Sequence, residues 1–249
     1  MNKKNYTIII QARLDSKRFP EKILKKVHGK EILTIMLERL KKKFKDRIIV
    51  AISNKDHKKI VNICYKQKIK FFLGSENNVL KRYYKCAVKN RIKTIVRIPS
   101  DCPLIDLDII KKGLKKFFSN NVDYVSNLLP RSYIDGNDVE IFSIKCLEKI
   151  YNRAISKYDK EHVTTFLQRN RNKGIFKIIN FKATKDLSLK YRLTLDYKED
   201  LVVIKRILAN KNIFLNYKSI ESIFKKNPNI SKINDKYIGK MWYQKKNNS

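Results

Sequence analysis

Residues 7–24 read TIIIQARLDSKRFPEKIL, a short apolar run followed directly by a basic loop. The apolar residues lack helical spacing and are typical of a strand that is covered on both faces. Pro20 fixes the backbone near the end of the loop. Because open α/β folds bind phosphates where their strands end, this stretch indicates a phosphate-binding loop at the carboxyl edge of a sheet.

The loop carries side chains that suit a nucleoside triphosphate, namely Arg13, Ser16, Lys17, Arg18 and Lys22. Arginine can fork onto phosphate oxygens, lysine places a point charge, and backbone N–H groups around residues 12–16 can form an anion-binding nest. Nucleotide transfer needs such groups because stabilising phosphate charge is most of the catalysis. The alternative is that a lysine-rich chain has cations in any loop by chance. The loop also matches neither a Walker A nor a dinucleotide-binding motif.

The composition is that of a folded globular protein of one large or two modest domains, with 249 residues of which 43% are hydrophobic. No apolar run approaches the ~20 residues that span a bilayer. The apolar run near the start is also too short for a secretory signal. We therefore expect a cytoplasmic protein with no membrane partner.

The formal net charge of +35 is extreme. It is typical either of a protein that binds nucleic acid or a membrane surface, or of codon bias in an A+T-rich genome. The lysines are spread along the whole chain, and no RRM, KH, helix-turn-helix or zinc-finger motif is present, which favours codon bias. The four cysteines are far apart and distant from the histidines, so neither a zinc site nor disulfides are expected.

Strand-like and helix-like patterns alternate along the first hundred residues. The expected strands span 7–10, 47–53, 68–73 and 93–98, and the expected helices span 31–43, 56–66 and 77–90. Such alternation predicts an α/β fold with a mostly parallel central sheet and helices on both faces. The functional loops should lie at the carboxyl ends of its strands.

The second half of the chain is expected to continue the same domain. Strands are predicted at 122–126 and 139–142, separated by a long loop over 128–138 that is either a lid or a binding loop. Residues 174–181 and 189–195 predict a small β-hairpin extension. We expect one domain over 1–226, followed by a polar tail over 227–249 that packs on the surface or frays.

Carboxylates stand at two predicted strand ends. Asp101 follows the strand at 93–98 between two prolines, and Asp196 follows the segment at 189–195. Mg²⁺ prefers one or two carboxylates together with phosphate and water oxygens, so either residue is a candidate ligand. The alternative for each site is a helix N-cap, which we assign to Asp106 in the first case and which remains open for Asp196.

Several motifs in the same order carry a resemblance to a known family. They are QARLDSKRFPEK at 11–22, GSENNVLKRY at 74–83, SDCPLI at 100–105, DVEIF at 138–142, EHVT at 161–164 and RLTLDYKEDL at 192–201. In this order they resemble the cytidylyltransferases of bacterial polysaccharide synthesis. That group includes the spore-coat polysaccharide type and the 3-deoxy-manno-octulosonate and acylneuraminate cytidylyltransferases. The resemblance covers residues from about 6 to 210.

The resemblance implies a Rossmann-like nucleotide-diphospho-sugar transferase fold, CTP and a sugar acceptor as substrates, Mg²⁺ as cofactor, and a homodimer. By position, Arg13, Arg18 and Lys22 would hold the triphosphate, with Lys22 and Arg13 as catalytic residues. Asp101 and Asp196 would bind Mg²⁺, which favours the ligand role for Asp196 over the cap. The remaining nucleotide-binding positions would be Ala12, Ser16, Gly74, Ser75 and Arg82.

The acceptor would lie near Asp138, Glu140 and His162. The alternative for Glu140 is a subunit contact, and a histidine at a helix is more often structural. The family commonly has glycine where this chain has Asp15, Glu21 and Ser100. A carboxylate facing the triphosphate would weaken binding by ~1 kcal/mol or more. Alternatives that keep the fold are another nucleoside triphosphate, or a polyol phosphate or phosphonate as acceptor.

Overall fold

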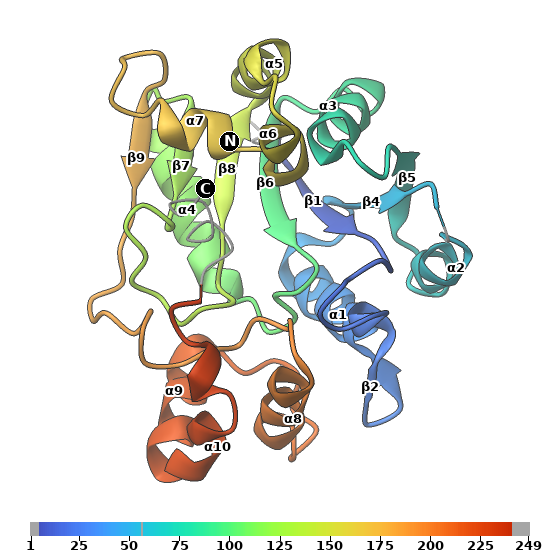
Figure 1. Cartoon of the computed structure of the whole chain (residues 1–249), viewed down its shortest axis with the longest axis vertical. Helices are drawn as coiled ribbons and strands as arrows, with labels where there is room; N and C mark the ends of the chain where they lie inside the picture. The colour runs from blue at the N-terminus through green and yellow to red at the C-terminus, as the bar shows by residue number, and fades with distance from the viewer. Residues whose placement is uncertain (1–4, 56, 241–249) are drawn as a thin grey trace.

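The computed structural model describes residues 5–55 and 57–240, and within them one seven-stranded sheet forms the centre of the protein (Figure 1). The strand order is β5-β4-β1-β6-β8-β7-β9. The bounds are β1 Thr7–Ala12, β4 Ile48–Ser53, β5 Lys70–Gly74, β6 Thr94–Pro99, β7 Tyr124–Ser126, β8 Glu140–Ser143 and β9 Ile178–Asn180. All neighbours pair in parallel except β8, which is antiparallel to both β6 and β7. The predicted mostly parallel α/β sheet is confirmed.

Helices cover both faces of the sheet. The bounds are α1 Ile32–Phe44, α2 Lys58–Lys66, α3 Val79–Lys89, α4 Leu107–Ser119, α5 Ile144–Arg153, α6 Lys157–His162, α7 Thr165–Arg169, α8 Lys198–Ile207, α9 Tyr217–Lys226 and α10 Pro228–Lys232. Successive residues of β1 point to opposite faces, so Ile8 and Ile10 pack in the core with α1, α2 and α4, while Ile9 packs in the core with α3 and α5. This explains the uninterrupted apolar run of the strand.

β1 lies at the point of the sheet where a ligand-binding site is expected. Its neighbours are β4 on one side and β6 on the other, so the strand order reverses direction beside it. At such a point the loops that leave adjacent strands diverge and leave room for a ligand at the carboxyl edge. The basic loop that follows β1 lies at this edge.

The small antiparallel hairpin is formed by β2 (Lys26–Val27) and β3 (Lys30–Glu31). The predicted hairpin of 174–181 with 189–195 is wrong. Only Ile178–Asn180 is a strand, and it pairs in parallel with β7. Leu193 and Leu195 are buried in a third core against α8 and α9, and their backbone N–H groups bind loop carbonyls instead of a partner strand. The apolar residues at 193 and 195 therefore alternate because they pack in this core, not because they belong to a strand.

Two predicted helix caps have different outcomes. Asp106 caps α4, because its carboxylate accepts from the N–H groups of residues 108 and 109, as predicted. Asn78 rather than Asn77 caps α3. The predicted start of the helix at residue 56 lies outside the described residues.

The chain after α9 is ordered up to the last described residue. α10 and the 3₁₀ turn η2 (Asp235–Tyr237) follow, and α10 lies beside α8 and α9 (Figure 1). Asn234, between them, is 1% exposed. The rest of the predicted tail, 241–249, lies outside the described residues. None of the described helices is long and apolar enough to cross a bilayer.

The long loop at 128–138 packs against the segment that ends at Asp196. Gly136 has φ +101°, and a Cβ there would lie 2.7 Å from the carbonyl carbon of Leu193 and from the backbone N of Thr194. Both neighbours are backbone atoms that side-chain rotation cannot move. Only glycine therefore allows this approach.

We predict that Gly136→Ala lowers the free energy of unfolding by at least about 3 kcal/mol, because a left-handed backbone strain and a backbone clash add together. Gly174→Ala is the matched control, since Gly174 has φ +69° and a Cβ there would meet no atom within 4 Å. It should cost only about 1 kcal/mol. Urea unfolding of both variants measures this; equal losses would contradict the clash.

Candidate active site

Three side chains from distant parts of the chain meet at the carboxyl edge of the sheet. The Nζ of Lys22, in the 3₁₀ turn η1 (Lys22–Leu24), lies 2.9 Å from Oδ2 of Asp101 and 2.8 Å from Oδ1 of Asp196. Asp101 follows β6, and Asp196 precedes α8. The side chains are 13%, 28% and 17% exposed, respectively, so the cluster is accessible from solvent. The two carboxylates, one after the end of β6 and one before the start of α8, converge on one cation.

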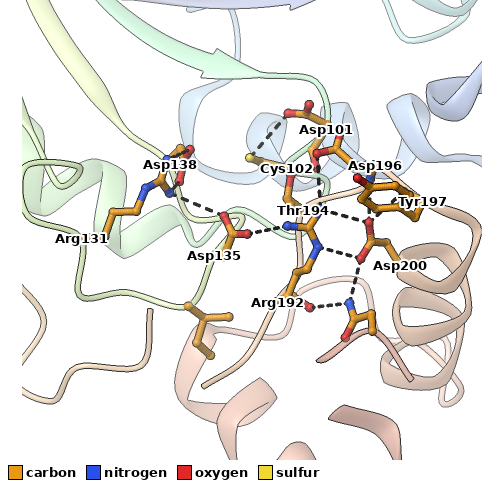
Figure 2. Close-up of polar contacts among 12 residues, drawn as sticks. Asp101, Cys102, Arg131, Asp135, Asp138, Arg192, Thr194, Asp196, Tyr197 and Asp200 are labelled. Atoms are coloured by element: carbon orange, nitrogen blue, oxygen red, sulfur yellow. Dashed lines mark hydrogen bonds and ion pairs between the residues drawn. The ribbon is translucent and has the colours of Figure 1, made fainter. Parts of the chain in front are cut away.

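The backbone joins the two carboxylate loops directly. The N–H of Leu195 donates to the carbonyl of Asp101 at 2.8 Å, and the hydroxyl of Thr194 donates to the same carbonyl at 3.3 Å. Figure 2 shows Asp101, Thr194 and Asp196 side by side. Asp101 and Asp196 therefore keep a fixed separation without help from their own side chains.

The arginines of the basic loop divide between two partners. Nη2 of Arg18 lies 2.8 Å from Oδ1 of Asp196, and its guanidinium carbon lies 5.5 Å from the centre of the Tyr197 ring. Nη2 of Arg13 instead lies 3.1 Å from Oε1 of Glu161, and both of these side chains are about half exposed. Exposed pairs of this kind contribute little energy, so Arg13 can exchange its partner easily.

Lys22 and Asp196 are both charged at neutral pH. Burial disfavours the charged form of Lys22, but the nearby carboxylates outweigh it and raise its pKa. Burial likewise acts to raise the pKa of Asp196, yet Lys22 and Arg18 lower it to about 2. The site thus holds two carboxylates, one ammonium and one guanidinium.

The donor set is of the kind that Mg²⁺ uses. Two carboxylates with open solvent beside them leave positions for water and phosphate oxygens, which this ion prefers over a full cage of protein ligands. In residues 5–55 and 57–240, no group of three or more His, Cys, Asp or Glu side chains could hold a metal ion by itself. The chemistry of the two carboxylates therefore fits a magnesium ion whose other ligands are water and phosphate oxygens.

The remaining nucleotide-binding candidates lie beside the basic loop and at the turn from β5 to α3. Ala12 is buried at the end of β1, and Ser16 is partly exposed in the loop. Nη1 of Arg82 donates to the carbonyl of Ser75 at 2.5 Å, and a Cβ on Gly74 would lie 2.9 Å from the Arg82 side chain. Burial lowers the pKa of Arg82 to about 10. Gly74 thus lets the arginine pack across the turn.

The acidic departures from the family pattern do not crowd the cluster. Asp15 is exposed, and the carboxylate of Glu21 lies 2.6 Å from Nζ of Lys59. Ser100 is buried. The charge of Glu21 is therefore already paired with a cation outside the cluster.

The three acceptor candidates have different surroundings. Asp138 forms a forked pair with Arg131 at 2.6 and 2.9 Å. Glu140 is 1% exposed, and its carboxylate is shared by Arg97, Tyr124 and Thr164. Glu140 is therefore a buried acceptor for one guanidinium and two hydroxyl groups instead of an exposed group.

His162 lies at the end of α6, with its ring centre 4.6 Å from that of Tyr158. Burial lowers its pKa to about 4, so the imidazole is neutral at pH 7. A neutral ring can accept or donate a hydrogen bond to an uncharged hydroxyl.

Sequence reasoning assigned no role to a group of buried charges behind Asp196. Arg192 and Asp200 stand in the motif at 192–201, and Asp135 lies in the long loop, but each is buried in an ion pair with another of the three. Burial and repulsion from Asp138 raise the pKa of Asp135 to about 6. The available signal was weak, because only Arg192 stands directly before alternating apolar residues.

Since Asp196 has a lower pKa in the folded chain than its ordinary 3.8, it stabilises the fold above that value, and this contribution is lost as pH falls through about 2. We predict that metal-free Asp196→Asn is about 2 kcal/mol less stable than wild type at pH 7. The difference should shrink between pH 4 and pH 2, as followed by urea unfolding. Asp15→Asn, which changes an exposed carboxylate of the basic loop, is the control. A difference that persists at pH 2 would contradict the pairing.

Comparison with known proteins identifies relatives along most of the chain. An uncharacterized protein of Methanocaldococcus jannaschii is 36% identical over 230 residues, which cover 91% of this chain and 93% of that protein. The spore coat polysaccharide biosynthesis protein SpsF of Bacillus subtilis is 29% identical over 206 residues, covering 80% and 84%. The solved structure of a cytidylyltransferase from Leptospira borgpetersenii superposes with a TM-score of 0.87 at 34% identity, covering 91% and 96%.

These similarities agree with the geometry at the carboxyl edge of the sheet. The family model described as cytidylyltransferase matches residues 7–223, which include the basic loop, Asp101 and Asp196. The chain therefore belongs to the cytidylyltransferase family.

Proposed function

We propose that this protein transfers CMP from CTP to an oxygen of a sugar acceptor, with Mg²⁺ as cofactor and pyrophosphate as the second product. The observation that carries the proposal is Lys22 held between Asp101 and Asp196 at the end of the basic loop, in a chain of this family. The similarity to a spore coat polysaccharide biosynthesis protein supports a surface glycan precursor as the acceptor class. The acceptor oxygen attacks the α-phosphorus, and the bond to the β-phosphate oxygen breaks.

In this proposal the basic loop binds and neutralises the triphosphate. Lys22 and Arg18 already face the carboxylates, so they lie where a metal-bound phosphate would bring its charge. Arg13 leaves its exposed partner Glu161 and forks onto phosphate oxygens. Lys22 stabilises the negative charge that develops on the leaving pyrophosphate.

Asp101 and Asp196 would hold the magnesium ion, which when bound supplies positive charge to the reacting phosphate and helps to align it. The acceptor would lie towards Asp138 and the neutral His162. We expect the acceptor to be an acidic sugar. The family resemblance also implies that the protein is a homodimer, which light scattering of the purified protein would test.

We predict that Lys22→Ala and Asp101→Asn each reduce pyrophosphate release by about 10²- to 10³-fold, because each removes a group that stabilises transition-state charge. Lys25→Ala is the matched control, since Lys25 is a neighbouring lysine that contacts the ring of Phe19 and no carboxylate of the cluster. Its rate should stay close to wild type. Thermal melts confirm that the variants are folded, and near-normal turnover by either site variant would refute its role.

We predict that CTP with Mg²⁺ raises the melting temperature more than ATP, GTP or UTP at equal concentration, because a ligand that binds only the folded state stabilises it by mass action. If another triphosphate raises the melting temperature more than CTP does, that triphosphate takes the place of CTP in the proposal. The acceptor is then found by a pyrophosphate-release screen of acidic sugars, aldoses, polyol phosphates and phosphonates. Tight RNA binding with a steep salt dependence, together with no nucleotide-induced shift of the melting temperature, would contradict the proposed enzymatic function.

A further inference from the structure

We propose that the segment at 228–240 is part of the active site's support, and that Asn234 is a positioning residue for Asp196. The segment lies beyond residue 223, where the match to the family ends. The inference rests on the proposed function, since it concerns a carboxylate that would hold the magnesium ion.

The support begins with Asp200, in the first turn of α8. Its Oδ2 accepts from the backbone N–H groups of Asp196 at 2.8 Å and Tyr197 at 2.9 Å, as Figure 2 shows. A carboxylate in this position satisfies N–H groups that the helix leaves unpaired and fixes the backbone that enters it. Asp200 therefore sets the position of the Asp196 main chain.

Arg192 sets the orientation of the Asp196 side chain. It is buried, with Nε 2.9 Å from Oδ1 of Asp200, Nη1 3.0 Å from Oδ2 of Asp135 and Nη2 3.3 Å from Oδ2 of Asp196 (Figure 2). The opposite oxygen of Asp196, Oδ1, is the one that faces Lys22. Because each oxygen has its own cationic partner, the plane of the carboxylate is defined.

Asn234 completes this arrangement from the C-terminal side. Its Nδ2 donates to Oδ1 of Asp200 at 2.8 Å and to the carbonyl of Arg192 at 3.2 Å. The residue is 1% exposed, so water cannot replace these bonds. Without Asn234, Oδ1 of Asp200 keeps Arg192 as its donor, and the carboxylate gains freedom to rotate away from the N–H groups that it holds.

A second contact links the same segment to the site. The ring of Tyr237 stacks on Tyr197 with centres 3.7 Å apart and planes 4° apart, and its hydroxyl donates to Glu199 at 3.1 Å. The guanidinium of Arg18, which contacts Asp196, also lies over the Tyr197 ring. The segment therefore restrains the chain on both sides of Asp196, through Asn234 on Asp200 and through Tyr237 on Tyr197.

The test measures the binding of Mn²⁺, as a spectroscopic substitute for Mg²⁺, by electron paramagnetic resonance in the presence of CTP. Asn234→Ala should weaken Mn²⁺ binding by about tenfold, the lower end of what loss of an outer support costs a metal site. CTP affinity without metal should change by less than about twofold, because Asn234 touches none of the phosphate-binding side chains. Neither measurement requires the acceptor.

Asn227→Ala is the matched control. It removes the same side chain from the residue that directly precedes the segment, but Asn227 is exposed and its side chain bonds only the carbonyl of Ile223 in the described structure. Its Mn²⁺ affinity should equal that of wild type. Asn234→Asp, which faces Asp200 with a like charge, should lose more affinity than Asn234→Ala.

Circular dichroism at the temperature of the assay separates positioning from folding. A purely structural role predicts a lower melting temperature with unchanged Mn²⁺ affinity in the folded variant. Should Asn234→Ala fail to fold, Tyr237→Leu replaces it and should weaken Mn²⁺ binding through the lost stacking on Tyr197. Wild-type affinity in the folded variant overturns this inference alone, whereas a wild-type protein that binds neither CTP nor Mn²⁺ with CTP overturns the proposed function as well.

Discussion

One ammonium group between two carboxylates constrains three separate loops. Lys22 belongs to the loop after β1, Asp101 to the loop after β6, and Asp196 to the segment before α8. Two carboxylates held this close repel each other unless cations lie between them. Lys22 and Arg18 provide those cations before any substrate is bound. The same charges complement a metal-bound triphosphate, which brings both the cation for the carboxylates and the anion for the loop, so binding exchanges partners instead of burying new unpaired charge.

The position of this cluster follows from the strand that precedes it. β1 is apolar on both faces and lies between β4 and β6, so it cannot shift without disturbing the cores on both sides. The loop after it therefore starts from a rigid point. The N–H of Leu195 on the carbonyl of Asp101 gives the opposite wall of the site comparable rigidity. Side chains placed on such fixed backbone can be oriented to within the tolerance that phosphate transfer needs.

The sequence was sufficient for those parts of the protein that follow a periodic pattern or a topological rule. Continuous apolar runs identified the parallel strands, and the rule that their carboxyl ends share one edge placed the basic loop and Asp101 together, while the family resemblance added Asp196. The predicted hairpin of 174–181 with 189–195 was wrong because Leu193 and Leu195 are spaced two residues apart to fill a core. The same spacing of apolar residues occurs in a strand that is paired in a sheet. The sequence could not predict that Arg13 pairs with Glu161 or that Asn234 donates to Asp200. A contact between residues far apart in the chain leaves no periodic signal in the sequence.

The distribution of the basic residues bears on the meaning of the net charge of +35. In the described part of the chain, the buried cations are Arg39, Arg82 and Arg192, and no lysine is buried to the same degree. Arginine suits such positions because its planar fork satisfies several acceptors at once and is weakly hydrated. Arg192 shows this with three carboxylates around one guanidinium. Buried arginines thus have a structural role in this fold, while the described lysines lie at exposed or partly exposed positions where water solvates the ammonium group.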